Sequence, residues 1–228
     1  MTDSHLRAVE ITHPQGCDAE AAVIWLHGLG ANGHDFEPVV PQLPVPPEIG
    51  IRYIFPHAPV MPVTINGGMA MPAWYDIKAI DIDRHVDEQQ LLESARRVHD
   101  LTARERERGI ASDHILVGGF SQGGAVAYQA ALTFPEPLAG LFSLSSYLAT
   151  AASLRVNSAQ HQIPVLVCHG LQDAVVPEAL GRQSVEGLGR LGIQAEYRTY
   201  TMEHSLCLEE VQDLGRFFTS VLSRRPTA

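Results

Sequence analysis

The segment HILVGGFSQGGAVAYQAALTF, residues 114–134, contains the most informative pattern in this chain. Residues 115–118 form a β-branched apolar run typical of a buried strand, and residues 125–134 have the composition of a helix. Between them, residues 119–123 read Gly-Phe-Ser-Gln-Gly and fit G-x-S-x-G, which in a strand-turn-helix context holds an exposed nucleophilic serine. A glycine-rich packing turn is the alternative. We predict that Ser121 is a nucleophile.

The physics of such a turn explains its spacing. The turn is strained and pushes the serine out of the sheet, and glycine at positions 119 and 123 lets the two flanking segments approach closely. The following helix directs its N–H groups and the positive end of its dipole toward developing negative charge. The N–H of Gln122, directly after the serine, is therefore one expected donor of an oxyanion hole.

A serine nucleophile needs a base that is oriented by an acid, and in this architecture the chain order is serine, acid, histidine. The segment PVLVCHGLQDAVVP, residues 164–177, places Asp173 after a strand, where its alternative role is to cap the next helix. His204 is the only histidine after Asp173 and follows a strand-like segment at 195–201. The sequence thus predicts a triad of Ser121, Asp173 and His204.

A second oxyanion donor should come from a loop after an early strand. The segment AAVIWLHGLGANGHDF, residues 21–36, offers such a loop, and we assign the donor to the N–H of Leu29. His27 and His34 could be taken for a zinc pair, but their spacing suits no common zinc motif. We expect no metal.

Apolar runs alternate with helical patterns along the 228 residues, which predicts a single α/β domain with a largely parallel sheet. Strand ends should meet at one edge of that sheet, where open α/β sheets place their sites. In the helix expected at 87–108, one apolar face recurs through Leu91, Ala95, Val98 and Thr102. Further helices are expected at 125–134, 178–191 and 208–222, and strands at 22–26, 52–55, 115–118, 138–144, 165–168 and 195–201.

Residues 58–82 interrupt this rhythm with three prolines, three methionines and Trp74-Tyr75. We expect a long ordered loop near the active site, because long loops in compact domains are commonly functional. A surface insertion without a role is the alternative.

Composition excludes several classes of protein. The net charge of −10 disfavours nucleic acid and anionic membranes as partners. The only lysine is Lys78, so no P-loop can be built around Ser121. Three widely spaced cysteines form no disulfide framework. The first ten residues lack an apolar signal-peptide region, and no apolar run is long enough to span a bilayer, so we expect a cytoplasmic protein without stable membrane insertion.

Six blocks occur in an order that resembles the carboxylesterase/acyl-protein thioesterase family of α/β-hydrolases, over residues 22–218. They are WLHGLGANGHDF, FPHAP, MPAWYDI, GGFSQGGAVA, HGLQDAVVP and MEHSLCLEEV. The resemblance implies an α/β-hydrolase fold, with a mostly parallel twisted sheet, helices on both faces and no large separate cap. It also implies a cofactor-free serine hydrolase acting on a small-molecule ester or an acyl thioester.

By position in the family pattern, Ser121, His204 and Asp173 take the triad roles, with Leu29 and Gln122 as oxyanion donors. Met69, Met71 and Trp74 fall where the family shapes its acyl channel and are candidate substrate-binding residues. The blocks follow a bacterial-looking variant, which favours a carboxylesterase of short- to medium-chain acyl esters. An acyl-protein thioesterase or lysophospholipase is the alternative, as are an acyltransferase with the same triad and an inactive binding module. A homodimer is left open.

Overall fold

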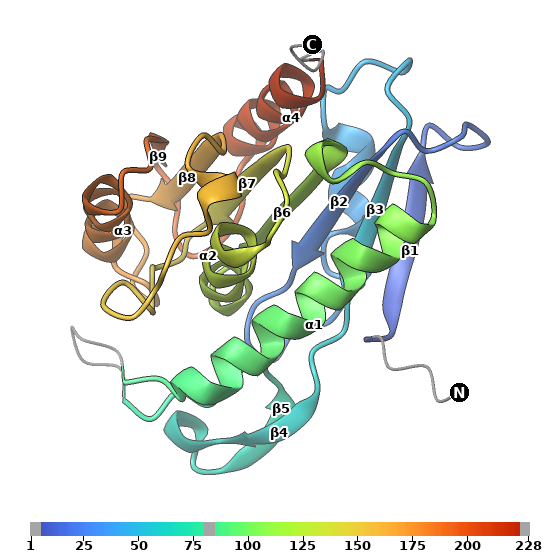
Figure 1. The fold of residues 1–228 in the computed structure, drawn as a ribbon. Helices are drawn as coiled ribbons and strands as arrows, with labels where there is room; N and C mark the ends of the chain where they lie inside the picture. The colour runs from blue at the N-terminus through green and yellow to red at the C-terminus, as the bar shows by residue number, and fades with distance from the viewer. Residues whose placement is uncertain (1–5, 80–84, 224–228) are drawn as a thin grey trace.

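A seven-stranded sheet runs through the computed structural model, which describes residues 6–79 and 85–223 (Figure 1). Its strands lie in the order β1-β3-β2-β6-β7-β8-β9. β1 is antiparallel to β3, whereas the other neighbouring pairs are parallel. The bounds are β1 Ala8–His13, β2 Ala21–Leu26, β3 Ile51–Pro56, β6 Ile115–Phe120, β7 Gly140–Leu144, β8 Val165–Gly170 and β9 Ala195–Tyr200. All six predicted strands are present, and β1 was not predicted.

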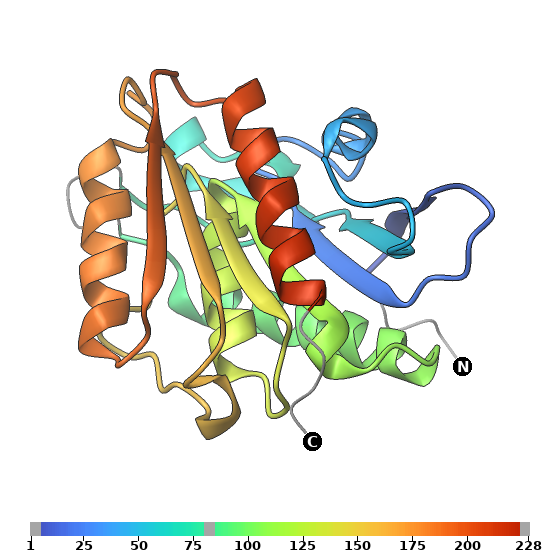
Figure 2. The same ribbon diagram turned by 90° about the horizontal axis from the view of Figure 1, so that it is seen from above.

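Helices cover both faces of the sheet, as the sequence predicts (Figures 1 and 2). Side chains of a strand alternate between faces, so the even-numbered residues of β2 enter one hydrophobic cluster and the odd-numbered residues enter the other. The first cluster packs under α1, α2 and α3, and the second under α4 and the 3₁₀ helix Glu37–Gln42. The helices are α1 Glu88–Glu107, α2 Gln122–Thr133, α3 Glu178–Arg190 and α4 Leu208–Leu222.

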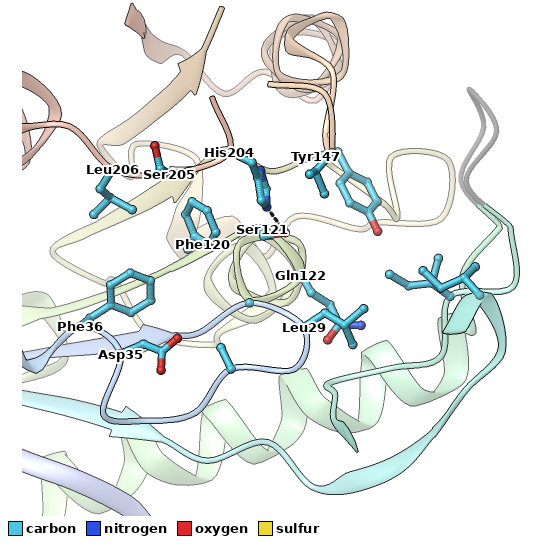
Figure 3. Close-up of a pocket in the computed structure, with 15 residues that line it drawn as sticks. Leu29, Asp35, Phe36, Phe120, Ser121, Gln122, Tyr147, His204, Ser205 and Leu206 are labelled. Atoms are coloured by element: carbon cyan, nitrogen blue, oxygen red, sulfur yellow. Dashed lines mark hydrogen bonds between the residues drawn. The ribbon is translucent and has the colours of Figure 1, made fainter. Parts of the chain in front are cut away.

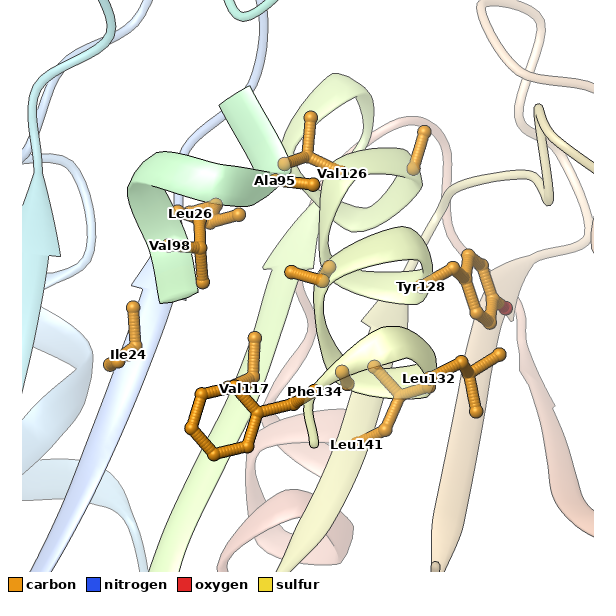
Figure 4. Packing of buried hydrophobic residues seen from close by; sticks show 14 of the residues in the cluster. Ile24, Leu26, Ala95, Val98, Val117, Val126, Tyr128, Leu132, Phe134 and Leu141 are labelled. Carbon is orange, nitrogen blue, oxygen red and sulfur yellow. The ribbon is translucent and has the colours of Figure 1, made fainter. Parts of the chain in front are cut away.

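The core beneath α1 and α2 positions α2 against the sheet (Figure 4). The predicted apolar face of α1 is buried, and its Ala95 and Val98 pack in the same cluster as Val126 of α2 and Leu26 of β2. Burying such side chains contributes about 25 cal/mol for each Å² of apolar surface. This packing holds the N-terminus of α2 at the end of the central strand β6, where the G-x-S-x-G residues lie.

α2 starts at Gln122, three residues before the predicted start at 125. Gly123 and Gly124 have low helix propensity, which moved the prediction toward the C-terminus. Their small size is needed here, because a Cβ at Gly123 would lie 2.5 Å from the carbonyl oxygens of both Leu26 and His27. Close approach of the helix to the loop after β2 therefore outweighs propensity.

The predicted loop 58–82 contains regular structure. Its described part forms an antiparallel hairpin of β4, Val60–Val63, and β5, Met69–Pro72, and a bridge then joins Ile77 to Val86. Residues 80–82 of the predicted loop lie outside the described residues. None of the helices in the described part of the chain is both long and apolar enough to cross a membrane.

Candidate active site

Ser121 occupies the turn between β6 and α2 in a backbone conformation that is unusual for a residue with a side chain. Its φ is 54° and its ψ is −121°. The end of β7 holds it there, because Ser121 N donates to Leu144 O at 2.9 Å and Ser146 Oγ donates to Ser121 O. A Cβ at Gly119 would lie 2.5 Å from the carbonyl carbon of Gly123. The two glycines of G-x-S-x-G are therefore in the close contact that the sequence predicts.

The three residues predicted as a triad form a continuous hydrogen-bonded chain. His204 Nε2 lies 3.0 Å from Ser121 Oγ, and His204 Nδ1 lies 2.7 Å from Asp173 Oδ2. An ionised carboxylate can only accept, so Nδ1 carries the proton and Nε2 is left to accept from the serine hydroxyl. This is the tautomer that a general base next to a serine requires.

Asp173 is held as a carboxylate although it is almost completely buried. Burial raises the pKa of its carboxyl, but the hydrogen bonds from His204 and from the N–H groups of Val176 and Val175 outweigh burial and bring the pKa below its ordinary value. His169 Nε2 lies 3.6 Å from Asp173 Oδ2 and donates to Val176 O at 2.8 Å. Burial lowers the pKa of His169, so this second histidine is neutral and ties down the loop that carries the acid.

A largely apolar cavity of about 460 Å³ opens beside Ser121 and His204 (Figure 3). Its volume lies in the range of small-molecule sites. Phe120 contacts His204 with ring centroids 4.6 Å apart, and in Figure 3 Phe36 and Leu206 lie on one side of the serine and Tyr147 on the other. The other lining residues are Gly28, Leu29, Ala31, Asp35, Ile65, Ile77, Gln122, Val175 and Ser205.

Both predicted oxyanion donors line this cavity next to Ser121. Gln122 is the first residue of α2, so its N–H is free of the helix ladder, and Leu29 lies in the loop after β2. Within the described residues, neither backbone N–H donates a hydrogen bond to the protein. Two unengaged N–H groups at a cavity wall are what an oxyanion hole requires.

The three candidate substrate-binding residues do not line the cavity. Met69 is 65% exposed on the hairpin, and Trp74 is 1% exposed in the core. Met71 accepts a hydrogen bond from Asn66 on the same hairpin. The residues of this excursion that line the cavity are Ile65 and Ile77. The apolar character of a residue alone did not show whether it lines the cavity or packs in the core.

Sequence reasoning also missed polar groups behind the site. His27 is buried, and its ring bonds to Gly28 O and to Ala58 N. Burial lowers the pKa of His27, which keeps the ring neutral.

Across residues 6–79 and 85–223, no three histidine, cysteine or acidic side chains gather as a metal site would require.

Comparison with known proteins identifies the family and the relatives of this chain. A family model described as phospholipase/carboxylesterase matches residues 8–222. Acyl-protein thioesterase 1 of Neurospora crassa is 39% identical over 215 residues, which cover 90% of this chain and 88% of the relative. Acyl-protein thioesterase 1 of Gibberella zeae is 35% identical over 95% of this chain and 97% of its own.

Two solved structures have the same fold over nearly the whole chain. Acyl-protein thioesterase 2 of Zea mays superposes with a TM-score of 0.82 at 28% identity, covering 95% of this chain and 100% of its own. SOBER1 of Arabidopsis thaliana superposes with a TM-score of 0.84 at 27% identity, covering 90% and 100%. This chain therefore belongs to the phospholipase/carboxylesterase family of α/β-hydrolases.

Proposed function

We propose that this protein hydrolyses acyl esters and thioesters through an acyl-enzyme intermediate on Ser121. The observation that carries the proposal is the hydrogen-bonded chain from Ser121 Oγ through His204 to Asp173, with distances of 3.0 and 2.7 Å. This hydrogen-bonded chain reaches the wall of a cavity that Leu29 and Gln122 also line, and the backbone N–H groups of these two residues donate no hydrogen bond within the described residues. Membership of a family of serine hydrolases supports the same chemistry.

In the first half of the reaction, Ser121 Oγ attacks the acyl carbonyl carbon while His204 Nε2 takes the hydroxyl proton. The N–H groups of Leu29 and Gln122 donate to the oxyanion, and Asp173 stabilises the imidazolium. When the tetrahedral intermediate collapses, the bond to the leaving oxygen or sulfur breaks and His204 returns the proton to it. Water then attacks the acyl-enzyme with His204 again as base, which releases a carboxylic acid and restores Ser121.

Two substrate classes remain as candidates. The sequence pattern favours short- to medium-chain carboxylic esters, whereas the relatives at 35–39% identity are named acyl-protein thioesterases. The apolar lining of the cavity suits an acyl chain in either case. We favour thioesters as substrates because the relatives named acyl-protein thioesterases match nearly the whole chain.

A fluorophosphonate probe tests the serine hydrolase chemistry, because it phosphonylates an activated serine. Intact mass spectrometry of the wild-type protein should show one adduct, and the Ser121→Ala protein should show none. Turnover by Ser121→Ala should fall by about 10⁴- to 10⁶-fold. Retention of a tenth of the activity in a folded variant would contradict the assignment.

A matched pair of substrates tests the class. S-octanoyl and O-octanoyl compounds with otherwise identical leaving groups should be compared by kcat/KM, together with acyl chains from two to sixteen carbons. The ratio of kcat/KM for the thioester to kcat/KM for the ester should exceed the ratio of their rates of hydrolysis by hydroxide, which measures their intrinsic reactivity. Equal or lower relative preference would favour the carboxylesterase.

A further inference from the structure

The Gln122 side chain points away from the reaction and holds the segment after the β4–β5 hairpin. It is 2% exposed. Its Oε1 accepts from the backbone N–H of Trp74 at 2.9 Å, and its Nε2 donates to the carbonyl of Tyr75 at 2.7 Å. Both ends of the amide are therefore used, which fixes its orientation. The residue whose backbone N–H is one proposed oxyanion donor is joined by its side chain to Trp74.

Trp74 continues the connection toward the other donor. Its indole Nε1 donates to the carbonyl of His27 at 2.8 Å, and its ring centroid lies 5.1 Å from that of His27. Its own carbonyl accepts from Ser94 Oγ of α1. Trp74 thus has a partner at its N–H, at its carbonyl and at its indole, and its position is set from three directions. His27 lies two residues before Leu29.

The last link is the peptide plane between Gly28 and Leu29. Ala58 N donates to His27 Nε2 at 3.1 Å, so the ring proton is on Nδ1, which donates to Gly28 O at 2.7 Å. In a trans peptide the C=O and the following N–H point in opposite directions. The Gly28 carbonyl faces the buried His27 ring, so the Leu29 N–H faces away from that ring, and Leu29 lines the cavity.

We propose that the Trp74 indole and the Gln122 side chain are positioning residues that hold the two oxyanion donors as one unit. We call the connection Gln122 side chain–Trp74–His27 carbonyl the Trp74 bridge. The proposal rests on the oxyanion hole of the proposed function. The bridge is needed because each donor lies next to a glycine, Leu29 after Gly28 and Gln122 before Gly123, and glycine adds conformational freedom to the backbone. An oxyanion hole lowers the barrier only when its donors are held in place before the reaction.

Trp74→Phe tests the bridge, because phenylalanine keeps an aromatic ring but cannot donate to His27 O. The chain contains a matched control in its other tryptophan, Trp25, which is also fully buried but whose Nε1 makes no hydrogen bond with any described residue. Trp25 faces the opposite cluster. Trp25→Phe therefore removes the same indole atoms from the core without touching the bridge.

We expect Trp74→Phe to lower kcat by about 10- to 100-fold with KM changed less than about threefold, because a donor displaced by up to about 1 Å loses this much rate. Binding of an alkyl trifluoromethyl ketone, which forms a tetrahedral adduct with the serine, should weaken by the same factor. Trp25→Phe should leave both quantities within about twofold of wild type, measured on variants matched for folding by thermal unfolding. A higher KM at unchanged kcat would make Trp74 a substrate-wall residue and overturn the proposal, as would equal effects of the two variants.

Gln122→Met is the second test, since it keeps the backbone donor and removes both side-chain hydrogen bonds. It should lower kcat in the same direction, and the double variant with Trp74→Phe should lose less than the product of the two single effects, because both act on one unit. If neither variant folds, the bridge has a folding role and the proposal is wrong. Fluorophosphonate labelling distinguishes failure of the proposed function from failure of the Trp74 bridge. A wild-type protein without an adduct refutes the proposed function, whereas an active wild type with unaffected bridge variants refutes the bridge alone.

Discussion

Adding one methyl group at Gly123 should impair both catalysis and folding. A Cβ at this position would lie 2.5 Å from the carbonyl oxygens of Leu26 and His27, and Cβ contacts under 3.0 Å are essentially never seen in proteins. The obstructing atoms are backbone, so α2 and the loop after β2 must separate by at least about 0.5 Å. Those two elements carry the N–H groups of Gln122 and Leu29, the two proposed oxyanion donors. Since a displacement of about 1 Å can cost about 10²-fold in rate, we expect Gly123→Ala to lower kcat by about 10- to 100-fold.

The assay compares kcat and the free energy of unfolding of Gly123→Ala with those of Gly189→Ala. Gly189 lies near the end of α3, and a Cβ there would meet no atom within 4 Å. The control should keep full activity and gain about 0.5–1 kcal/mol, because alanine is the better helix former. Gly123→Ala should lose about 1–3 kcal/mol, as for overpacking elsewhere. If Gly123→Ala retains kcat within twofold of wild type, the reasoning from close approach to donor geometry is refuted.

Three further results are expected. Asp173→Asn should lower kcat by about 10⁴-fold at pH 8, because an amide N–H facing His204 favours the wrong tautomer; a smaller than tenfold loss would contradict this. Ser121→Gly should melt at a higher temperature than Ser121→Ala, because glycine relieves about 1–3 kcal/mol of backbone strain that alanine keeps. Burial raises the pKa of the Glu210 carboxyl to about 8. Neither of its oxygens has a hydrogen-bond partner of ordinary geometry among the described residues, the nearby Cys207 N–H included. Between an ordinary pKa of 4.5 and about 8 the folded state holds a proton that the unfolded state has lost, so stability falls as pH rises. Glu210→Gln should therefore raise the melting temperature more at pH 8 than at pH 5, and an equal gain would disprove the shift.

The sheet was predictable because its central strands are buried on both faces and read as short apolar runs. β1 was missed because it is a half-buried edge strand that contains Glu10 and lacks such a run. The hairpin β4–β5 was read as a loop because prolines depress strand propensity. It is a two-stranded sheet of its own, so its prolines interrupt no central strand.

The candidate triad was predictable because chain order and the strand-turn-helix context leave few choices. The surroundings of the triad were not. Trp74 was assigned to the cavity wall from its place in a block, yet it lies in the core with its indole bonded to His27 O. His169 precedes Asp173 in the chain and so falls outside the order of serine, acid and histidine, although it contacts the same loop. Which partner a buried polar atom finds depends on packing between distant segments, and spacing along the chain does not encode it.

The conformation of Ser121 sets two selective pressures against each other, one for catalysis and one for the stability of the fold. With φ at 54° and ψ at −121°, the position suits glycine better than serine, so the serine side chain lowers the stability of the fold. A lineage that no longer needed hydrolysis would gain stability by a single change to glycine, while the turn, the sheet and the cavity stayed intact. Under the proposed function, a glycine at this position in a related chain would therefore mark the loss of hydrolysis, while the fold around it stayed unchanged.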